Sequence, residues 1–225
     1  MTTLGLIGSG RIGGTLARLA VDAGIDVVLS NSRGPETLAE LVGELGERAR
    51  AATPEQAAAA DIVVVTIPVR EYGRVPADAL VGKVVIDTGN YTVGRDGEIA
   101  DLADGGTTSS ELLQRYLPRS RVVKAFNYIY FQHLAVLGRA ADAKDRTTLP
   151  IAGDDSEAKA DAAQLLSALG YDSLDIGPLA EGWRLEPGTP VYGAPFADGT
   201  PFWDRPGTPA DSATVGKAVD AAERP

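Results

Sequence analysis

The chain has 225 residues, a hydrophobic fraction of 44% and a formal net charge of -10. This length suits one large domain, or one domain with a smaller C-terminal addition. With no cysteine and a single histidine, His133, the sequence excludes disulfides, thiolate-bound metals and histidine-cluster sites, so we expect no metal site. A chain this acidic is repelled by nucleic-acid phosphates and by anionic membrane surfaces, so we expect neither as a partner.

No segment of the sequence suggests a membrane or an export signal. The longest largely apolar stretch, residues 62–69, is far too short to span a bilayer. The first residues lack a basic region, and glycines interrupt their apolar run, unlike a signal peptide. We therefore expect a cytoplasmic location.

Strand and helix signals alternate from the first residues to about residue 177. Strands are expected at 3–8, 25–30, 62–67, 83–87, 121–125, 148–153 and 171–176, and helices at 11–23, 35–45, 109–116 and 156–169, with a short helix opening at Thr53-Pro54. The nearly continuous apolar character of 62–67 is typical of a parallel strand covered on both faces. This alternation predicts an α/β fold over residues 1–177, with a Rossmann-type, doubly wound and mostly parallel sheet.

Residues 178–225 have a different composition. Prolines and glycines alternate there with aromatic residues, namely Trp183, Tyr192, Phe196, Phe202 and Trp203. Disordered linkers are usually poor in aromatics, so we expect an extended tail that packs on the domain or on a partner subunit. The second possibility favours a homodimer. Residues 211–225 are expected to form a short exposed helix or to fray.

A GxGxxG motif lies between the first expected strand and the first expected helix. It consists of Gly8, Ser9, Gly10, Arg11, Ile12 and Gly13. Gly8 permits a tight turn, Gly10 lets the backbone approach a pyrophosphate, and Gly13 allows helix and strand to pack closely. The helix N-terminus offers free amides to the phosphates. The motif predicts a dinucleotide site; the alternative is a glycine turn without a ligand.

The end of the second expected strand indicates which dinucleotide binds. NAD-specific sites usually place an acidic residue there to hold the ribose 2′-hydroxyl, whereas this sequence has Asn31, Ser32 and Arg33. A guanidinium can pair with phosphate oxygens through two hydrogen bonds, which suits the 2′-phosphate of NADP(H). The alternative is a polar turn that leads into the next helix.

Further candidates follow the central strands. Ligands of open α/β sheets bind outside the carboxyl ends of the strands. We therefore expect the nicotinamide half of the dinucleotide near these strand ends, which carry Thr66, Ile67, Pro68, Val69, Asn90 and Asn127. Each of these residues could instead serve only to cap a loop.

No pair of residues resembles an acid–base team. His133 has no orienting partner nearby in sequence, so we interpret it as a surface or hydrogen-bonded histidine. Lys124 either faces the crevice or is a solvated edge residue, and Tyr128 and Tyr130 either donate a proton or pack. We therefore predict no catalytic side chain: hydride transfer between two bound cofactors needs only positioning and exclusion of water.

Seven segments together resemble a known family. They are GSGRIGG (8–14), NSRGPETL (31–38), VVVTIPV (63–69), VIDTGNY (85–91), RVVKAFNYIY (121–130), PIAGDD (150–155) and DIGPL (175–179). The chain resembles the NADP oxidoreductases that depend on the deazaflavin coenzyme F-420, and is similar to the cytosolic reductase domains of six-transmembrane iron reductases. The resemblance implies hydride transfer between NADP(H) and a deazaflavin or flavin. It also implies that residues 9–12 hold the pyrophosphate, that residues 67–69 contact the nicotinamide half, and that Asn127 and Ile129 face the second cofactor's ring.

The sequence also departs from that family. Archaeal F-420 members carry histidine in place of Asn127 and smaller residues in place of Tyr130 and Phe131, so these aromatics narrow or reshape the pocket. Two other functions remain open: an NADPH-dependent reductase of a small carbonyl or imine, and a non-catalytic NADP(H)-sensing protein. The first needs a proton donor and usually a helical C-terminal domain, for which the chain has no room. The second would bind NADP(H) without turnover.

Overall fold

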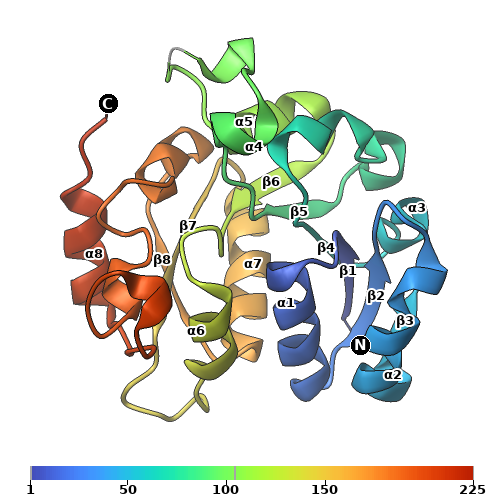
Figure 1. Cartoon of the computed structure of the whole chain (residues 1–225), viewed down its shortest axis with the longest axis horizontal. Coiled ribbons are helices and arrows are strands. Elements are labelled where there is room, and N and C mark those ends of the chain that lie inside the picture. The colour runs from blue at the N-terminus through green and yellow to red at the C-terminus, as the bar shows by residue number, and fades with distance from the viewer. Residues whose placement is uncertain (1, 104, 225) are drawn as a thin grey trace.

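A single eight-stranded sheet organises the chain (Figure 1). The computed structural model describes residues 2–103 and 105–224. The strands are β1 (Thr3–Ile7), β2 (Asp26–Ser30), β3 (Ala49–Ala51), β4 (Ile62–Val65), β5 (Val84–Asp87), β6 (Arg121–Lys124), β7 (Thr148–Gly153) and β8 (Asp172–Asp175). Their order is β3-β2-β1-β4-β5-β6-β7-β8, and neighbours run parallel except β6 and β7. The predicted doubly wound, mostly parallel sheet is thereby confirmed.

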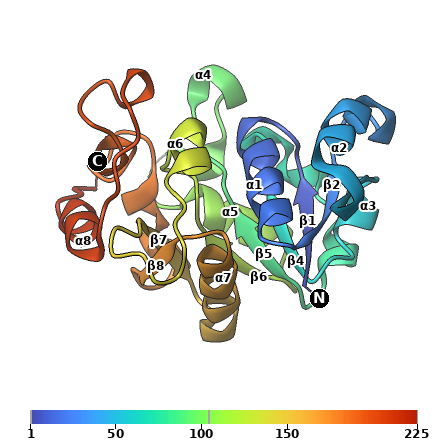
Figure 2. The ribbon, with the colours of Figure 1, turned by 90° about the horizontal axis from the view of Figure 1, so that it is seen from below.

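Helices cover both faces of this sheet. They are α1 (Arg11–Asp22), α2 (Ala39–Leu45), α3 (Pro54–Ala57), α4 (Val93–Asp96), α5 (Ser109–Tyr116), α6 (Phe131–Val136), α7 (Ser156–Ala168) and α8 (Ser212–Asp220). One apolar cluster packs the sheet against α1, α2, α6, α7 and α8, and Figure 2 shows α1 and α6 side by side. A second cluster packs it against α3 and α5. Every residue of β4 is therefore buried, as its apolar sequence predicts.

Local signals explain where several helices begin and end. Thr53 caps α3 and Thr108 caps α5, each through a capping box with the residue three positions later. Asp155 caps α7 by accepting a hydrogen bond from Ala158 N. After α1, Gly24 adopts a positive φ of 79°, which an L side chain rarely adopts.

Two parts of the chain differ from the sequence-based elements. The single helix expected at 35–45 is a 3-10 turn (Pro35–Leu38) followed by α2, because Leu38, with φ -102° and ψ 3°, departs from helical geometry. The short edge strand β3 was not predicted, since three residues that pair only with β2 carry no readable alternation.

The tail folds back on the domain as a series of turns rather than as an extended segment. Its 3-10 turns are Leu179–Leu185, Ala194–Phe196 and Phe202–Asp204, and α8 follows. Gly193 N donates to Tyr128 O at 2.8 Å, and Thr148 N donates to Ala210 O at 2.8 Å, which ties the tail to β7 and to the loop after β6. Residues 211–225 were expected to form an exposed helix or to fray. Instead, Val215 of α8 is buried in the main apolar cluster, so α8 is partly buried. A contact between the tail and a partner subunit stays a prediction.

Within the described residues, no helix combines the length and the apolar character that crossing a membrane requires.

Candidate functional site

A cavity of about 420 Å³ opens at the carboxyl ends of β1, β2 and β4. It brings together the glycine turn, the loop after β2 and the loop after β4, which lie far apart in the sequence. Its lining consists of Ile7, Gly8, Ser9, Gly10, Asn31, Ser32, Arg33, Pro54, Thr66, Ile67, Pro68, Arg70, Glu71 and Arg74. Three separate motifs of the sequence analysis therefore face one space.

The three glycines of the turn differ in what surrounds them. Gly8 has a φ of 110°, and its carbonyl accepts a hydrogen bond from Thr66 Oγ1 at 2.8 Å. A Cβ on Gly13 would lie 2.2 Å from Gly8 O, so α1 packs against this turn only with glycine there. A Cβ on Gly10 would meet nothing within 4 Å. Gly10 is the N-cap of α1, and no side chain among the described residues caps this helix, so its first amides remain available to an anion.

The loop after β2 presents three polar side chains to the cavity. Asn31 Oδ1 accepts hydrogen bonds from Arg33 N at 2.9 Å and Gly34 N at 3.0 Å, so the Asn31 side chain shapes the turn. Ser32 and Arg33 are exposed. Among the residues that the structure describes, none forms an ion pair with Arg33 or hydrogen bonds to its guanidinium. Arg33 is thus a free cation at the cavity.

The opposite wall contains charged residues that the sequence analysis missed. Arg70, Glu71 and Arg74 belong to the 3-10 segment Val69–Arg74. Glu71 pairs with Arg74 Nη1 at 2.9 Å and with Arg70 Nε at 3.3 Å, and Arg70 also donates to the Arg95 carbonyl. The sequence signal that could have indicated these charged residues is VREYGR (69–74), which directly follows the strand-end motif. The arginines on both walls make this cavity locally basic in an acidic chain.

The remaining predicted residues do not line this cavity. They are Arg11, Ile12, Gly13, Val69, Asn90, Asn127 and Ile129. Arg11 lies beside the cavity, in a groove that Arg33 also lines, with its guanidinium 5.3 Å from the centre of the Phe131 ring. Val69 is buried in the apolar layer under the cavity. Asn127 and Ile129 are only 5% and 3% exposed.

Asn90 and Asn127 instead form a hydrogen-bonded cluster with the tail. Asn90 Nδ2 donates to Asn127 O at 2.7 Å and to Tyr192 Oη at 3.2 Å. Asn127 Nδ2 donates to Asn90 Oδ1 at 2.8 Å and to Leu185 O at 2.6 Å. The tail therefore covers the ends of β5 and β6. Tyr192 was not among the predicted site residues.

A buried ion pair lies directly below this cluster. Lys124 is 1% exposed, and its Nζ lies 3.3 Å from Asp87 Oδ2, so both sequence-based interpretations of Lys124, crevice-facing or solvated, were wrong. Asp87 also accepts hydrogen bonds from Tyr72 Oη and Ser110 Oγ, both at 2.6 Å. Burial, followed by the Asp87 charge, raises the pKa of Tyr72 well above its ordinary value. The pair also holds the loop after β5 in place through hydrogen bonds, because Gly89 N donates to Asp87 and Gly89 O accepts from Lys124.

His133, Tyr128 and Tyr130 each contact other residues of the protein through hydrogen bonds or ring packing. His133 is buried, and its Nε2 lies 2.8 Å from Arg205 O, which agrees with a hydrogen-bonded rather than a surface histidine. Tyr128 is buried and donates to Pro150 O at 2.6 Å. Tyr130 makes edge contacts with the rings of Phe131 and Phe202.

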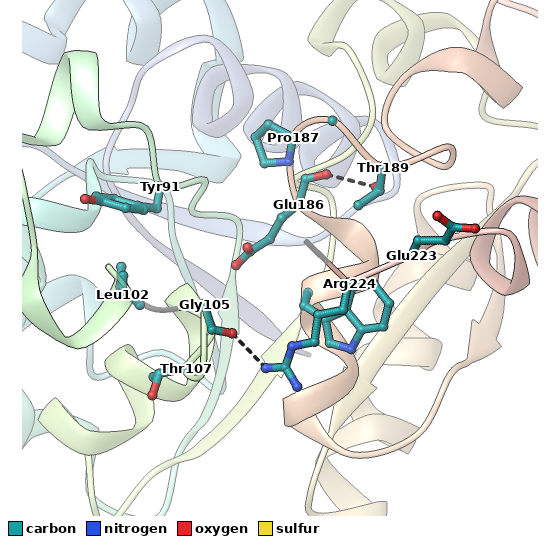
Figure 3. Close-up of a pocket in the computed structure, with 11 residues that line it drawn as sticks. Tyr91, Leu102, Gly105, Thr107, Glu186, Pro187, Thr189, Glu223 and Arg224 are labelled. Atoms are coloured by element: carbon teal, nitrogen blue, oxygen red, sulfur yellow. Dashed lines mark hydrogen bonds between the residues drawn. The ribbon is translucent and has the colours of Figure 1, made fainter.

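A second cavity of about 260 Å³ is lined by residues of the tail and of the segment between β5 and α5 (Figure 3). Figure 3 shows the Glu186 carboxylate pointing into it, with Tyr91 on one side and Arg224 on the other. Arg224 lies 5.9 Å from the Trp183 ring centre and donates to Gly105 O at 2.9 Å. No predicted site residue lines this cavity.

Comparison with known proteins identifies relatives of the chain. A family model described as NADP oxidoreductase, coenzyme F-420-dependent, matches residues 3–91. Metalloreductase STEAP3 of Rattus norvegicus is 31% identical over 186 residues, which cover 81% of this chain and 35% of the metalloreductase. The chain therefore spans about a third of the length of that relative.

Two solved structures share most of the fold. The hypothetical protein SMa0349 of Sinorhizobium meliloti superposes with a TM-score of 0.74 at 31% identity, covering 85% of this chain and 93% of that one. A protein of Arthrobacter sp. FB24, named as a candidate F-420-dependent NADP reductase, has a TM-score of 0.68 at 26% identity, covering 82% and 88%. The family match includes every segment that lines the cavity at the ends of β1, β2 and β4. Residues 3–91 therefore belong to the family of NADP oxidoreductases described as coenzyme F-420-dependent.

Proposed function

We propose that the chain binds NADP(H) in the cavity at the carboxyl ends of β1, β2 and β4 and transfers a hydride between it and a flavin-type acceptor, either coenzyme F-420 or a flavin. One observation carries the proposal: the uncapped N-terminus of α1 and the free Arg33 guanidinium face the same cavity. A dinucleotide with a 2′-phosphate presents anionic groups at two separate points, which these two features match.

The proposed placement assigns each wall of the cavity a role. The amides of residues 9–12 hold the pyrophosphate, and Gly10 leaves room for its approach. Ser32 and Arg33 hold the 2′-phosphate, with Arg70 and Arg74 on the facing wall. Residues 66–68 lie against the nicotinamide half, and Val69 supports them from below. Bound NADPH supplies the hydride, while the protein orients it and excludes water.

The residues at the strand ends favour hydride transfer without a general acid or a general base. Thr66 and Asn90 are neutral, and the ionisable Asp87 and Lys124 neutralise each other in the interior. Asn127 lies beneath the tail and Ile129 is buried in the apolar core, so we place both behind the acceptor ring. A homodimer and a cytoplasmic location are also proposed; the exposed Trp203 ring of the tail suits a subunit contact.

An acceptor panel tests the proposed function. The purified protein is mixed with NADPH and, separately, with F-420, FMN, FAD, a ferric chelate and small cyclic imines, and nicotinamide absorbance is followed. Oxidation of NADPH by F-420 or a flavin is the expected result. Oxidation by imines alone would replace the proposal with the carbonyl or imine reductase. Tight NADPH binding with no turnover would replace it with the NADP(H) sensor.

A further inference from the structure

The strand-end cluster fixes the direction of every hydrogen bond that it makes. Asn90 Oδ1 accepts from Asn127 Nδ2, which also donates to Leu185 O. The Asn90 amide nitrogen must therefore point the other way, toward Asn127 O and Tyr192 Oη. Because an amide nitrogen only donates, the Tyr192 oxygen is the acceptor in its contact with Asn90.

Tyr192 is left with an unused hydroxyl hydrogen. No group among the described residues accepts a hydrogen bond from it; the hydroxyl's partner is Asn90, as donor. Burial raises the pKa of the Tyr192 phenol above its ordinary value, so the hydroxyl stays protonated at neutral pH. Tyr192 is half-buried. The cluster orients it as a neutral hydrogen-bond donor.

This donor lies close to the place where the hydride is proposed to transfer. Strand β5 is the neighbour of β4, and Thr88 N donates to Val65 O at 3.1 Å, so the loop that carries Asn90 starts beside the Thr66 end of the cavity. Adjacent strands lie about 4.8 Å apart. Aromatic rings continue from Tyr192 over this edge: Phe202 lies 5.9 Å from Tyr192 and 6.2 Å from Tyr130, centre to centre. A flat ring can pack against such a wall.

We infer that Tyr192 donates a hydrogen bond to a ring carbonyl of the hydride acceptor, and that Asn90 and Asn127 act as positioning residues for it. The inference rests on the proposed function. In the transfer, a C–H bond of the dihydronicotinamide breaks and a new bond to hydrogen forms on the acceptor ring. The nicotinamide is oxidised, and the acceptor gains two electrons and one hydrogen. The negative charge gained spreads onto the conjugated ring carbonyls until solvent supplies a proton. A fixed donor at such a carbonyl stabilises that charge.

Tyr192→Phe tests the inference because it removes only the hydroxyl. NADPH affinity should stay unchanged, while the single-turnover rate of hydride transfer to F-420 or FMN falls roughly 10- to 100-fold. Anaerobic titration of the protein with the oxidised and with the reduced acceptor, followed by tryptophan fluorescence, measures both affinities without turnover. The variant should lose more affinity for the reduced, charged acceptor than for the oxidised one. Tyr91→Phe is the matched control, because the Tyr91 hydroxyl already donates its hydrogen to Gly97 O at 3.0 Å. This variant should behave as wild type.

Asn90→Asp tests the positioning separately. A carboxylate at position 90 accepts the Tyr192 hydrogen and thereby removes the free donor, so it should reproduce the Tyr192→Phe loss although the phenol is present. A Tyr192→Phe variant with wild-type rate and an unchanged ratio of reduced to oxidised affinity overturns this inference alone. A wild type that binds NADPH but neither binds nor reduces F-420 or FMN overturns the proposed function, and this inference with it.

Discussion

Substituting alanine for two glycines of the turn should separate nucleotide binding from folding. The Gly10 backbone is extended, with φ -75° and ψ -158°, so an L side chain fits, and the new Cβ meets nothing within 4 Å. In Gly13→Ala the new Cβ lies 2.2 Å from Gly8 O and 2.9 Å from Thr66 Oγ1, and backbone must move. Overpacking of this kind costs about 1–3 kcal/mol. Gly10→Ala should therefore keep wild-type stability, and Gly13→Ala should fold with reduced stability.

The expected binding loss of Gly10→Ala follows from the hydrogen bonds at stake. The space beside Gly10 is where we place the pyrophosphate, and hydrogen bonds to charged groups contribute about 1.5–3 kcal/mol each. Loss of one such bond raises the NADPH Kd roughly 10- to 100-fold. Calorimetric titration measures the Kd, and thermal unfolding should show a Tm near wild type for Gly10→Ala but about 3–10 °C lower for Gly13→Ala. Wild-type NADPH affinity in Gly10→Ala would refute the reasoning, as would equal Tm losses in both variants.

Two further substitutions test the interior and the turn. Lys124→Met leaves Asp87 buried without its cation, so urea unfolding should show a loss of about 3–5 kcal/mol, and adding Asp87→Asn should recover part of it; an unchanged midpoint for the single variant would contradict the buried ion pair. Asn31→Ala removes the acceptor that shapes the turn, so NADPH affinity measured by titration should fall roughly 3- to 10-fold; if the Asn31 side chain only contacts solvent, affinity will not change.

Local sequence patterns predicted the parts of the fold that depend on residues close together in the sequence. The apolar run of β4, the capping box at Thr53 and the glycine turn at Gly8 each carry a physical requirement within a few positions. Arg70 and Arg74 carry no such requirement. They became site residues only because the loop after β4 faces the loop after β2 across the cavity.

Contacts between distant residues could not be predicted in the same way. The burial of Lys124 depends on Asp87, 37 positions earlier, and a lone lysine at a strand end resembles a solvated one. The composition of the tail indicated that it packs against something, but not that Tyr192 contacts Asn90, 102 positions away. Such pairings depend on the order of strands in the sheet, which the strand sequences themselves do not specify.

The most direct test compares NADPH with NADH on the wild type and on Arg33→Ala. Calorimetric titration should show that the wild type prefers NADPH, and that Arg33→Ala weakens NADPH binding roughly 10- to 100-fold while NADH affinity changes less than about threefold. Arg119→Ala is the control, because this arginine pairs with Asp78 at the surface, at 3.0 Å, and does not line the cavity. Equal losses of NADPH and NADH affinity in Arg33→Ala, or a wild type without preference, would contradict the 2′-phosphate site.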